Sequence, residues 1–426
     1  MKRFFVCILI LFCMKLHSTI YRLHDLINHG INNSTEVRNA QNSILNLEDS
    51  HRNFQLDWIP SANISLSYSH MNRFNTPTIE QLSSNEGLYS TGLSLGQSIA
   101  LNEPKYFNLR RSNINLQIAN NNLKSIKKKV ALDIVSAFID IKQQERSINI
   151  TEENQKLQVR LYEQTLIQFR THSKTIFDLQ QTQIDTLDTH IQLLDMRNQL
   201  NRQRENLFFL LKLEDQGFPF EDFDFKIQDI EIDLNSITNF NIKNSELRLI
   251  SSRSQLNQQY LGYFPHLTLG YNWGTSHSQK DFSSSLFQFD KFNTSGTFSF
   301  NLSYPLLNQF RQSLNYRTSR RNFSMEELSH QEMVYKTNQD IRQMINELTR
   351  LRQIYDLNVQ KHELTRRTLQ IAEQRYILGN ISNLDLDRAR IQYLNAEIQL
   401  NTRFYTIIRR QEDLNFLTSG KILGEW

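Results

Sequence analysis

Two aspartates, Asp178 and Asp385, are the residues of this chain whose type and position best suit a chemical role. They lie 207 positions apart, and each opens a predicted helix directly after a turn. In a symmetric assembly such a side chain repeats around the axis, and a ring of carboxylates attracts cations and repels anions. The simpler interpretation is a helix cap, because an acid in the first helical turn is favourable whatever the protein does. That interpretation accounts for both positions.

No arrangement for catalysis or metal binding stands out. The eleven histidines are scattered, and none is paired at metal-ligand spacing with a second ligand on one helix face. A phosphate-binding glycine loop, a glycine-framed serine nucleophile and a metalloprotease helix motif are all missing from the sequence. His172 lies at a predicted turn, where we interpret it as a solvated residue rather than a metal ligand. The sequence predicts no enzymatic activity, no metal and no cofactor.

Composition narrows the class of protein further. A mean hydropathy of −0.52 is too polar for a bundle of transmembrane helices. The formal charge of +4 over 426 residues gives no case for nucleic acid binding. We interpret the densest basic cluster as a solvated helix face, with contact to an acidic partner as the alternative. This cluster comprises Lys124, Lys127, Lys128 and Lys129.

The N-terminal residues are typical of a secretory signal peptide, predicted over residues 1–18. Two basic residues precede an apolar run over 4–14, which is too short to span a bilayer. Both cysteines, Cys7 and Cys13, lie in this segment. The mature chain is therefore expected to carry no thiol, no disulfide and no thiolate metal site.

The rest of the chain repeats one plan. Residues around 58–215 correspond to residues around 263–420 at an offset of 205 to 207 positions. For example, Trp58-Ile59-Pro60 corresponds to Tyr263-Phe264-Pro265. We therefore divide the mature chain into a first structural repeat over 19–215, an acidic connector over 216–234, a second structural repeat over 235–420 and a tail over 421–426.

Each repeat contains two strands about ten residues long, joined by a polar loop. The strands alternate apolar residues with small or polar ones, which is typical of outer-membrane barrels. The alternative is a soluble hairpin with a half-buried face. The strands are predicted over 61–70 and 91–102 in the first repeat, and over 266–274 and 295–304 in the second.

Each repeat also contains a long helical hairpin. Residues 105–169 contain no proline and no glycine, and their apolar residues recur every three or four positions. In the second repeat, seven positions from Val334 to Tyr355 form a coiled-coil seam with Thr337 as its one polar member. A helix of about 60 residues is roughly 90 Å long. The remaining helices are predicted over 23–55, 177–212 and 384–418.

Four strands are too few to close a barrel, and lipid does not tolerate an open sheet edge. Two chains would give a barrel of eight strands, which side chains fill, whereas three chains would give twelve strands and begin to leave a lumen. The seams of the long helices can likewise be buried only against neighbouring helices. These constraints favour a symmetric oligomeric conduit, with a trimer as the preferred form.

The turn of the second hairpin resembles that of the TolC-type outer-membrane efflux proteins. Within residues 374–389, Tyr376 is followed three residues later by Gly379, and Asp385 follows six residues after that. The first repeat keeps the aromatic residue and the aspartate but has His172 in place of the glycine. The resemblance extends over essentially the whole mature length.

This resemblance implies a mostly helical fold combined with a membrane β-barrel. A homotrimer would form a twelve-stranded barrel in the lipid of the outer membrane and a twelve-helix tunnel across the periplasm of a Gram-negative cell. The implied function is a passive exit duct of a tripartite efflux or type I secretion system. A periplasmic adaptor protein and an inner-membrane pump would dock at the tunnel tip. The residues implied to contact the adaptor are Gly379, Asn380, His172 and Ser173.

The resemblance also implies a gate at the tip. Asp385 would face the lumen, and Asp178 would hold the closed state by bonding to Tyr376. Two departures predict a looser lock. Ile381 stands where the family member with the best-understood lock has an arginine, and Arg388 stands where that protein has a second acid. The neighbouring Asp387 is the alternative source of that acid, although it lies on a different helix face.

Two other functions are compatible with the sequence. One is a structural coiled-coil envelope protein that does not conduct. The other is a surface-binding protein that uses the polar loops over 71–90 and 275–294. Amphipathic strand pairs in both repeats favour the duct. Drugs, metal ions and proteins are all open as its cargo.

Overall fold

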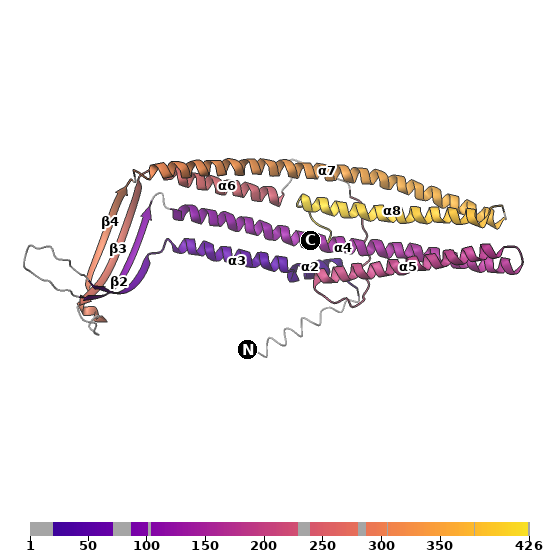
Figure 1. Ribbon diagram of the computed structural model, residues 1–426, viewed down its shortest axis with the longest axis horizontal. Coiled ribbons are helices and arrows are strands. Elements are labelled where there is room, and N and C mark those ends of the chain that lie inside the picture. The colour runs from indigo at the N-terminus through magenta and orange to yellow at the C-terminus, as the bar shows by residue number, and fades with distance from the viewer. Residues whose placement is uncertain are drawn as a thin grey trace, which may run out of the picture. The chain divides into compact units, whose positions relative to one another are not determined.

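The computed structural model describes residues 20–70, 87–100, 104–228, 239–279, 287–304, 306–378 and 380–424. The chain forms two compact units, and each unit draws on both halves of the sequence. The sheet unit comprises Asn42–Asn120 and Lys243–Met333. The hairpin unit comprises Met1–Gln41, Asn121–Ile242 and Val334–Trp426. Figure 1 labels the helices and strands of both units.

The sheet unit contains one antiparallel sheet in the order β1-β2-β3-β4. Its register places Ala62 beside Leu95 and Leu95 beside Trp273, so that apolar residues of neighbouring strands share a face. All four predicted strands are confirmed. Their bounds are Ser61–His70 for β1, Gly87–Ala100 for β2, His266–Gln279 for β3 and Asn293–Ser303 for β4.

The strands β2 and β3 are longer than predicted. Pairing between them continues as far as Tyr89 and Gln279, beyond the end of the alternating pattern. Thr275, Ser276 and His277 are all polar, so hydrophobic periodicity does not reveal this extension. Strand pairing therefore reaches into both loops that were predicted over 71–90 and 275–294. Residues 71–86 and 280–286 of those loops lie outside the described residues.

The polar face of the sheet carries only small, uncharged side chains over most of its area. Ser67 and Ser90 lie 2.7 Å apart through their hydroxyls, and the Ser299 hydroxyl donates to the Gly270 carbonyl at 3.3 Å. The register assigns the following residues to this face: Ser61, Asn63, Ser65 and Ser67 of β1; Ser90, Gly92, Ser94, Gly96 and Ser98 of β2; Thr268, Gly270, Asn272, Gly274 and Ser276 of β3; and Ser295, Thr297, Ser299 and Asn301 of β4.

Both edges of the sheet are open within one chain. β1 and β4 are the outer strands, and each has one neighbour. Every residue of β4 is exposed, including Phe298 and Phe300. An exposed edge of this length is a template for pairing with another strand.

One helix of the sheet unit, α6 (Phe240–Leu261), was not predicted. The side chains that it buries are polar, namely Asn244, Ser245 and Ser254. The Ser245 hydroxyl lies 2.8 Å from the His330 ring on α7 (Gln309–Ile377). Because α6 packs through polar groups, its sequence lacks the apolar period by which a buried helix face is recognised.

The first predicted helix, over 23–55, is wrong as a single element. It is two helices, α2 (Leu23–Asn33) and α3 (Thr35–Leu56), which are separated by Ser34. The Ser34 backbone N–H donates to the Gly30 carbonyl and closes α2, while its hydroxyl accepts from the Val37 N–H at the start of α3. Serine and asparagine compete for backbone hydrogen bonds in this way and favour helix ends.

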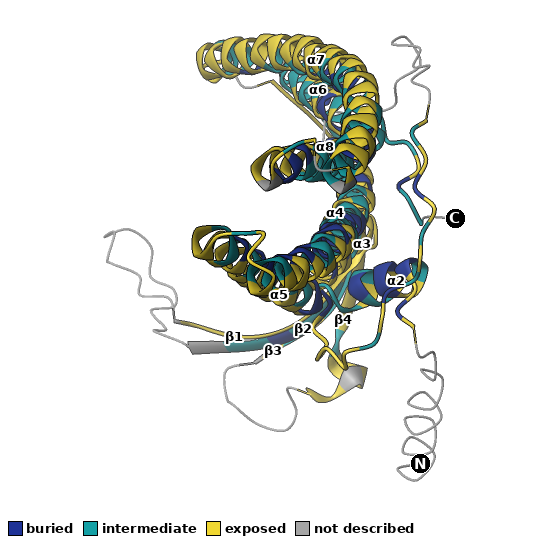
Figure 2. Ribbon diagram, turned by 90° about the vertical axis from the view of Figure 1, so that its right-hand side faces the viewer, coloured by how far each residue is buried: buried dark blue, intermediate teal, exposed yellow. Residues whose placement is uncertain are grey.

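The hairpin unit contains two helical hairpins side by side (Figure 2). The first is formed by α4 (Pro104–Arg170) and α5 (Ile176–Leu211), and the second by α7 and α8 (Asn383–Leu417). The Gln144 amide of α4 donates to the Met196 carbonyl of α5 at 2.9 Å, and the Asn401 amide of α8 donates to the Ser147 hydroxyl of α4 at 2.9 Å. The helices therefore follow one another in the order α5-α4-α8-α7.

The predicted seam of α7 faces the interior of this unit. Ile341, Leu348 and Leu351 are buried against α8, and Thr337 is buried as well. On α4 the burial extends beyond the predicted stripe. Phe138 is fully buried because the connector covers a second side of α4, and its ring lies edge-on to Phe220 with centroids 5.8 Å apart. A helix that is buried on two sides shows a broader apolar surface than one seam.

The connector is fastened by both charge and aromatic packing. Arg204 of α5 donates to both carboxylate oxygens of Asp215, at 2.6 and 2.8 Å, and its guanidinium lies over the Phe220 ring. Lys142 of α4 donates to the Phe220 carbonyl at 3.1 Å. Burial of Asp215 opposes its ionisation, but the hydrogen bonds from Arg204 and from the backbone outweigh this effect and lower its pKa. Tyr21 pairs with Phe220 in a single parallel bridge.

The basic cluster on α4 was interpreted incorrectly at one position. The ammonium group of Lys128 donates to the carbonyls of Ser419 and Gly420, at 2.8 and 2.7 Å. It therefore binds the backbone carbonyls just beyond the end of α8, where a helix leaves carbonyl groups without internal partners.

Candidate functional site

The tips of the two hairpins share a backbone hydrogen bond between corresponding residues. In the first, the Ser173 N–H donates to the Gln168 carbonyl at 2.8 Å, and in the second the Asn380 N–H donates to the Arg375 carbonyl at 2.8 Å. This pattern commonly ends a helix whose next residue is left-handed. His172 occupies that left-handed position with φ 62°. The corresponding Gly379, expected to contact an adaptor, lies outside the described residues.

His172→Gly should stabilise the first tip by about 1 kcal/mol, because a non-glycine residue is disfavoured in the left-handed region. The expected result is a small rise in the midpoint of thermal unfolding. His172→Ala serves as the control, since it removes the imidazole without relieving the backbone. An equal rise in both variants would show that the ring, and not the backbone conformation, limits stability.

Both predicted site aspartates cap their own helices. The Asp178 N–H donates to the Thr175 hydroxyl at 3.2 Å, and the Thr175 N–H donates back to the Asp178 carboxylate at 3.0 Å. The Asp385 N–H donates to the Ser382 hydroxyl at 3.2 Å, and that hydroxyl donates to the Asp385 carboxylate at 2.6 Å. The hydrogen bonds from Thr175 and Ser382 lower the pKa of the respective carboxyl groups. Both acids are therefore held in their ionised form.

Tyr376 lies half-buried at the second tip. It packs against a cluster of buried residues drawn from α4, α7 and α8, which includes Leu161 and Leu386. Burial raises the pKa of Tyr376, and the charges of Asp387 and Asp178 raise it further. Asp178 is thus within electrostatic reach of the tyrosine in one chain, although its carboxylate is engaged by the cap of its own helix.

The two departures from the family lock occupy different environments. Ile381 is partly buried and packs against the same cluster as Tyr376. Arg388 is exposed, and its charge helps to lower the pKa of Asp385. At one position an apolar residue therefore packs into the cluster, and at the other a cation lies beside the candidate ring acid.

Asp387, the alternative source of the second tip acid, is buried beneath the tip together with Arg390, and Arg390 was not predicted as part of the site. Asp387 is 8% exposed, and the Arg390 side chain is 11% exposed. An Arg390 guanidinium nitrogen lies 3.8 Å from a carboxylate oxygen of Glu373 on α7. The spacing of an acid and a base three residues apart on α8, next to the buried Leu386, is the sequence signal that could have revealed it.

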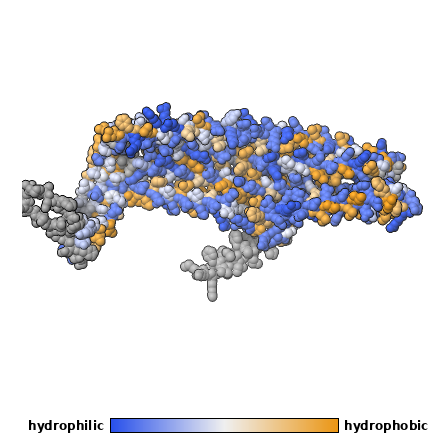
Figure 3. All heavy atoms as spheres, in the orientation of Figure 1, coloured by the Kyte–Doolittle hydropathy of each residue, from blue (hydrophilic) through white to orange (hydrophobic). Residues whose placement is uncertain are grey.

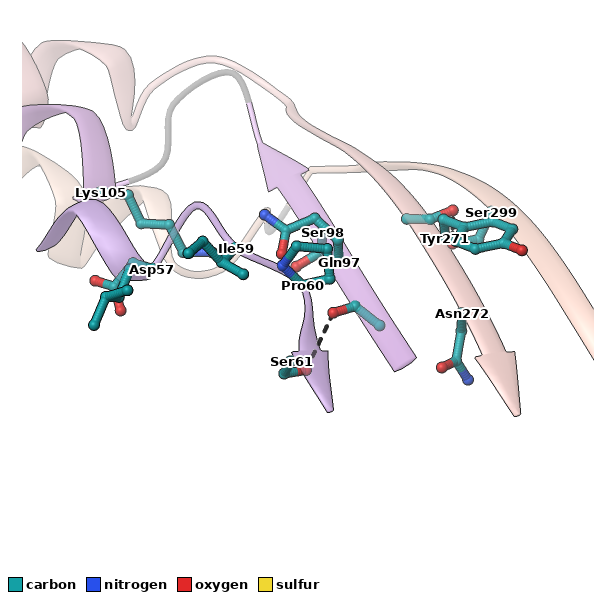
Figure 4. Close-up of a pocket in the computed structure, with 13 residues that line it drawn as sticks. Asp57, Ile59, Pro60, Ser61, Gln97, Ser98, Lys105, Tyr271, Asn272 and Ser299 are labelled. Atoms are coloured by element: carbon teal, nitrogen blue, oxygen red, sulfur yellow. Dashed lines mark hydrogen bonds between the residues drawn. The ribbon is translucent and has the colours of Figure 1, made fainter. Parts of the chain in front are cut away.

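A hollow lies in the sheet unit, at one end of the polar face (Figure 4). Its lining includes Asp57, Lys105, Gln97 and Asn272. The Ser61 hydroxyl donates to the Gly96 carbonyl at its edge, at 3.1 Å. Hydroxyl and amide groups predominate among its polar atoms, so this hollow suits water and small polar solutes better than a charged ligand.

Two further features of the described residues concern metal binding and membrane-spanning helices. No group of three or more His, Cys, Asp and Glu side chains in that part of the chain is arranged to hold a metal ion. Within the same residues, every helix is too short or too polar to cross a membrane.

The model of the family described as outer membrane efflux protein matches residues 26–211 and 233–420. The chain therefore belongs to the outer membrane efflux protein family. The family predicted from the tip of the second hairpin is confirmed. Members of this family are channels of the outer membrane that extend into the periplasm, and this protein is accordingly an outer-membrane efflux channel.

Solved structures share its fold at low sequence identity. The chain is similar to CusC, with a TM-score of 0.81 at 15% identity over 94% of this chain and 92% of that one. It is similar to the CmeC outer membrane channel of Campylobacter jejuni, with a TM-score of 0.76 at 16% identity over 93% and 85%. It is also similar to the outer membrane protein VceC of Vibrio cholerae, with 0.78 at 13% identity over 93% and 96%. No curated protein matches the chain in sequence.

Proposed function

We propose that three copies of this chain form the duct, and that it conducts passively, without catalysis or a cofactor of its own. The supporting observation is that one chain leaves two kinds of open edge. The outer strands β1 and β4 each lack a second neighbour in the four-stranded sheet. Strands β1 and β4 of adjacent copies would pair, and three copies would close a twelve-stranded barrel in the outer-membrane lipid.

The outer helices of the hairpin unit carry matching apolar stripes. Along α5, Ile184, Leu187, Ile191 and Leu194 follow a heptad pattern and are between 51% and 57% exposed. In Figure 3, apolar side chains gather near the right-hand end of the molecule, where the turns of the two hairpins lie.

The stripe on α7 recurs every seven residues. Its members are Leu357, Leu364 and Ile371, with Leu378 directly after the end of the helix, and they are between 52% and 72% exposed. Because α5 and α7 are the two ends of the row of helices, the stripe of one chain would bury the other stripe of the next chain, and this head-to-tail contact closes into a ring.

The first test is the mass of the detergent-solubilised protein together with its currents in planar lipid bilayers. We expect the mass of three chains and discrete channel currents. A stable, folded monomer would contradict the assembly, and a trimer without currents would contradict conduction.

We further propose that the hairpin tips hold both the gate and the contacts with a periplasmic adaptor, behind which an inner-membrane pump supplies the energy. A groove between α7 and α8 supports this assignment near the second tip. Its lining includes the apolar Ala372 and Ile381 and the charged Arg375, Arg388 and Asp385. His172, Ser173 and Asn380 lie in the turns of the two tips and would contact the same adaptor.

The matched segments 26–211 and 233–420 support an internal repeat, with its first copy over 19–215, the connector over 216–234 and the second copy over 235–420.

Asp385→Asn tests the ring of charge. Three carboxylates around the axis attract cations, so the variant should lose cation preference while the trimer stays intact. The asparagine oxygen can still accept from the Ser382 hydroxyl, so the helix cap survives. Reversal potentials in a salt gradient measure the selectivity.

Ser382→Ala is the matched control for this variant. It removes the capping hydroxyl but keeps the carboxylate, so it should cost about 1 kcal/mol of stability and leave the selectivity unchanged. If the Asp385→Asn channel has unchanged ion selectivity, Asp385 acts only in the cap of α8 and does not form a selective ring.

A further inference from the structure

Apolar and basic side chains are separated along the first turns of α7, directly beyond the sheet. Leu306 and Leu307 follow β4 and are 73% and 85% exposed, and Phe310 is 79% exposed. Figure 3 shows apolar side chains at the start of α7 and hydrophilic ones beyond them. Four arginines in these turns are exposed to solvent, namely Arg311, Arg317, Arg320 and Arg321.

These arginines have no acidic counterpart nearby in the chain. The sequence contains no aspartate or glutamate between Lys291 and Glu326. Among the described residues, none of the four arginines forms an ion pair, and Arg321 donates to the Thr318 hydroxyl at 3.5 Å. The positive charge of this segment is therefore not neutralised within one chain.

The neighbouring helices of the sheet unit add to this charge. Residues 104–132 of α4 contain no acid, and Arg110 in the first turns of α4 is exposed. Arg253 is exposed on α6. Asp57, an acid that directly follows α3, lines the same hollow as Lys105. The helical ends next to the sheet therefore carry an excess of positive charge.

The order of the side chains matches the layers of a membrane. Phe298 and Phe300 on the apolar face of β4 are 74% and 67% exposed, so this face would contact hydrocarbon. At 1.5 Å per helical residue, Leu314 lies about 8 Å and Arg321 about 18 Å beyond the start of α7. The apolar turn would thus reach the boundary of the acyl chains, and the long arginine side chains would extend among the headgroups.

A second copy of the chain cannot neutralise four arginines. In the proposed ring α3 would lie beside α7 of the next copy, because α3 leads into β1 and α7 follows β4. In the sheet unit this helix and the turn after it carry three acids and one arginine. The acid Asp49 already lies 3.7 Å from Arg52. An anionic partner other than the protein is therefore needed.

We propose that the start of α7 binds anionic phospholipid of the periplasmic leaflet. Leu306 and Leu307 would contact its acyl chains, and Arg317, Arg320 and Arg321 would bind its phosphate groups, which match the planar guanidinium fork. The inference rests on the membrane location of the sheet. It does not depend on conduction or on the gate at the hairpin tips.

The test is native mass spectrometry of the full-length protein in mild detergent, titrated with phosphatidylglycerol or with phosphatidylcholine of the same acyl chains. Each exposed cation near an anionic membrane surface strengthens binding roughly fivefold. We expect a clear preference for phosphatidylglycerol that weakens as the salt concentration rises. Equal binding of the two lipids, or a preference that ignores salt, overturns the inference without any variant.

The variant Arg317→Gln, Arg320→Gln and Arg321→Gln removes three charges. It should weaken binding of phosphatidylglycerol by about a hundredfold and leave binding of phosphatidylcholine nearly unchanged. The matched control removes three exposed arginines from the hairpin unit and should bind both lipids like the wild type. It comprises Arg160→Gln, Arg202→Gln and Arg342→Gln.

Leu306→Ser combined with Leu307→Ser tests the acyl contact separately. It should weaken binding of both lipids by the same factor, so that the preference for phosphatidylglycerol persists. A loss of the preference in this variant would contradict the assigned roles. Inorganic phosphate is the probe for a free anion, and displacement of phosphatidylglycerol by phosphate at equal concentration would overturn the lipid as ligand.

The same spectra separate this inference from the proposed function. If the arginine variant is monomeric in lipid-free detergent while the wild type is trimeric, the arginines serve the contact between copies and the inference is wrong. If the wild type is itself a monomer, the proposed assembly fails. Its relative affinity for the two lipids would still decide whether α7 binds anionic phospholipid.

Discussion

Leu364→Glu combined with Ile371→Glu is expected to abolish the trimer. Each side chain belongs to the exposed α7 stripe, and burial of a leucine or isoleucine contributes about 1.5–3 kcal/mol. In a closed ring of three chains, both losses recur at every contact. The new carboxylates would also have to be buried against the apolar stripe of α5, which is unfavourable without a partner charge. Mass measurement in detergent should find monomers whose helical content is unchanged.

Gln370→Glu is the control for charge on α7. Its side chain is exposed but lies about 100° around the helix from the stripe, so a carboxylate there should leave the trimer intact. Loss of the trimer in the control as well would mean that charge on α7, and not the stripe, decides assembly. If the variant with Leu364→Glu and Ile371→Glu is still a trimer, the contact between chains must lie on another surface.

Phe138→Ala is expected to destabilise the hairpin unit by about 3–5 kcal/mol, the range for truncating a fully buried phenylalanine. Phe138 contacts the Phe220 and Phe225 rings of the connector, and Lys142 lies over its face. The cavity would therefore loosen the connector as well as α4. Thermal unfolding and limited proteolysis of the connector measure the two effects.

Phe138→Leu is the control for the loss of buried volume at this position. It retains most of the buried volume, so it should cost clearly less than the alanine variant and leave the connector resistant to protease. Equal effects of the two substitutions would point to the aromatic contacts, rather than to the volume of the cavity, as the source of stability. Arg204 would still hold Asp215 in either variant.

The sequence predicted the elements whose packing is apolar and periodic. The seam of α7 was read correctly because Ile341, Leu348 and Leu351 face one interior, and the strands were read correctly because one face is apolar. Where packing is polar, as for Asn244 and Ser254 of α6, no period exists to be recognised. The break at Ser34 depends on two local hydrogen bonds, and helical patterning on either side conceals it.

The candidate site was predictable only in part, for a related reason. Asp178 and Asp385 were found because an acid that opens a helix directly after a turn is a local signal. The environment of Asp387 and Arg390 depends on which face of α8 is buried, and that is decided by α4, α5 and α7 together. Lys128 was misread because the carbonyls that it binds lie near the other end of the chain.

In the proposed barrel, the polar face of the sheet would line the exit of the duct and give it a particular surface chemistry. Serine, threonine, asparagine and glycine offer a passing solute hydrogen bonds much like those of the water that it gives up. A wall of this kind stays hydrated and attracts neither cations nor anions over most of its area. It offers few apolar side chains to which a hydrophobic solute could bind. Cargo that has passed the tips would therefore meet no trap before it reaches the outside. Residence in the barrel would depend on diffusion and on molecular size, and sorting of cargo would be left to the components that load the duct.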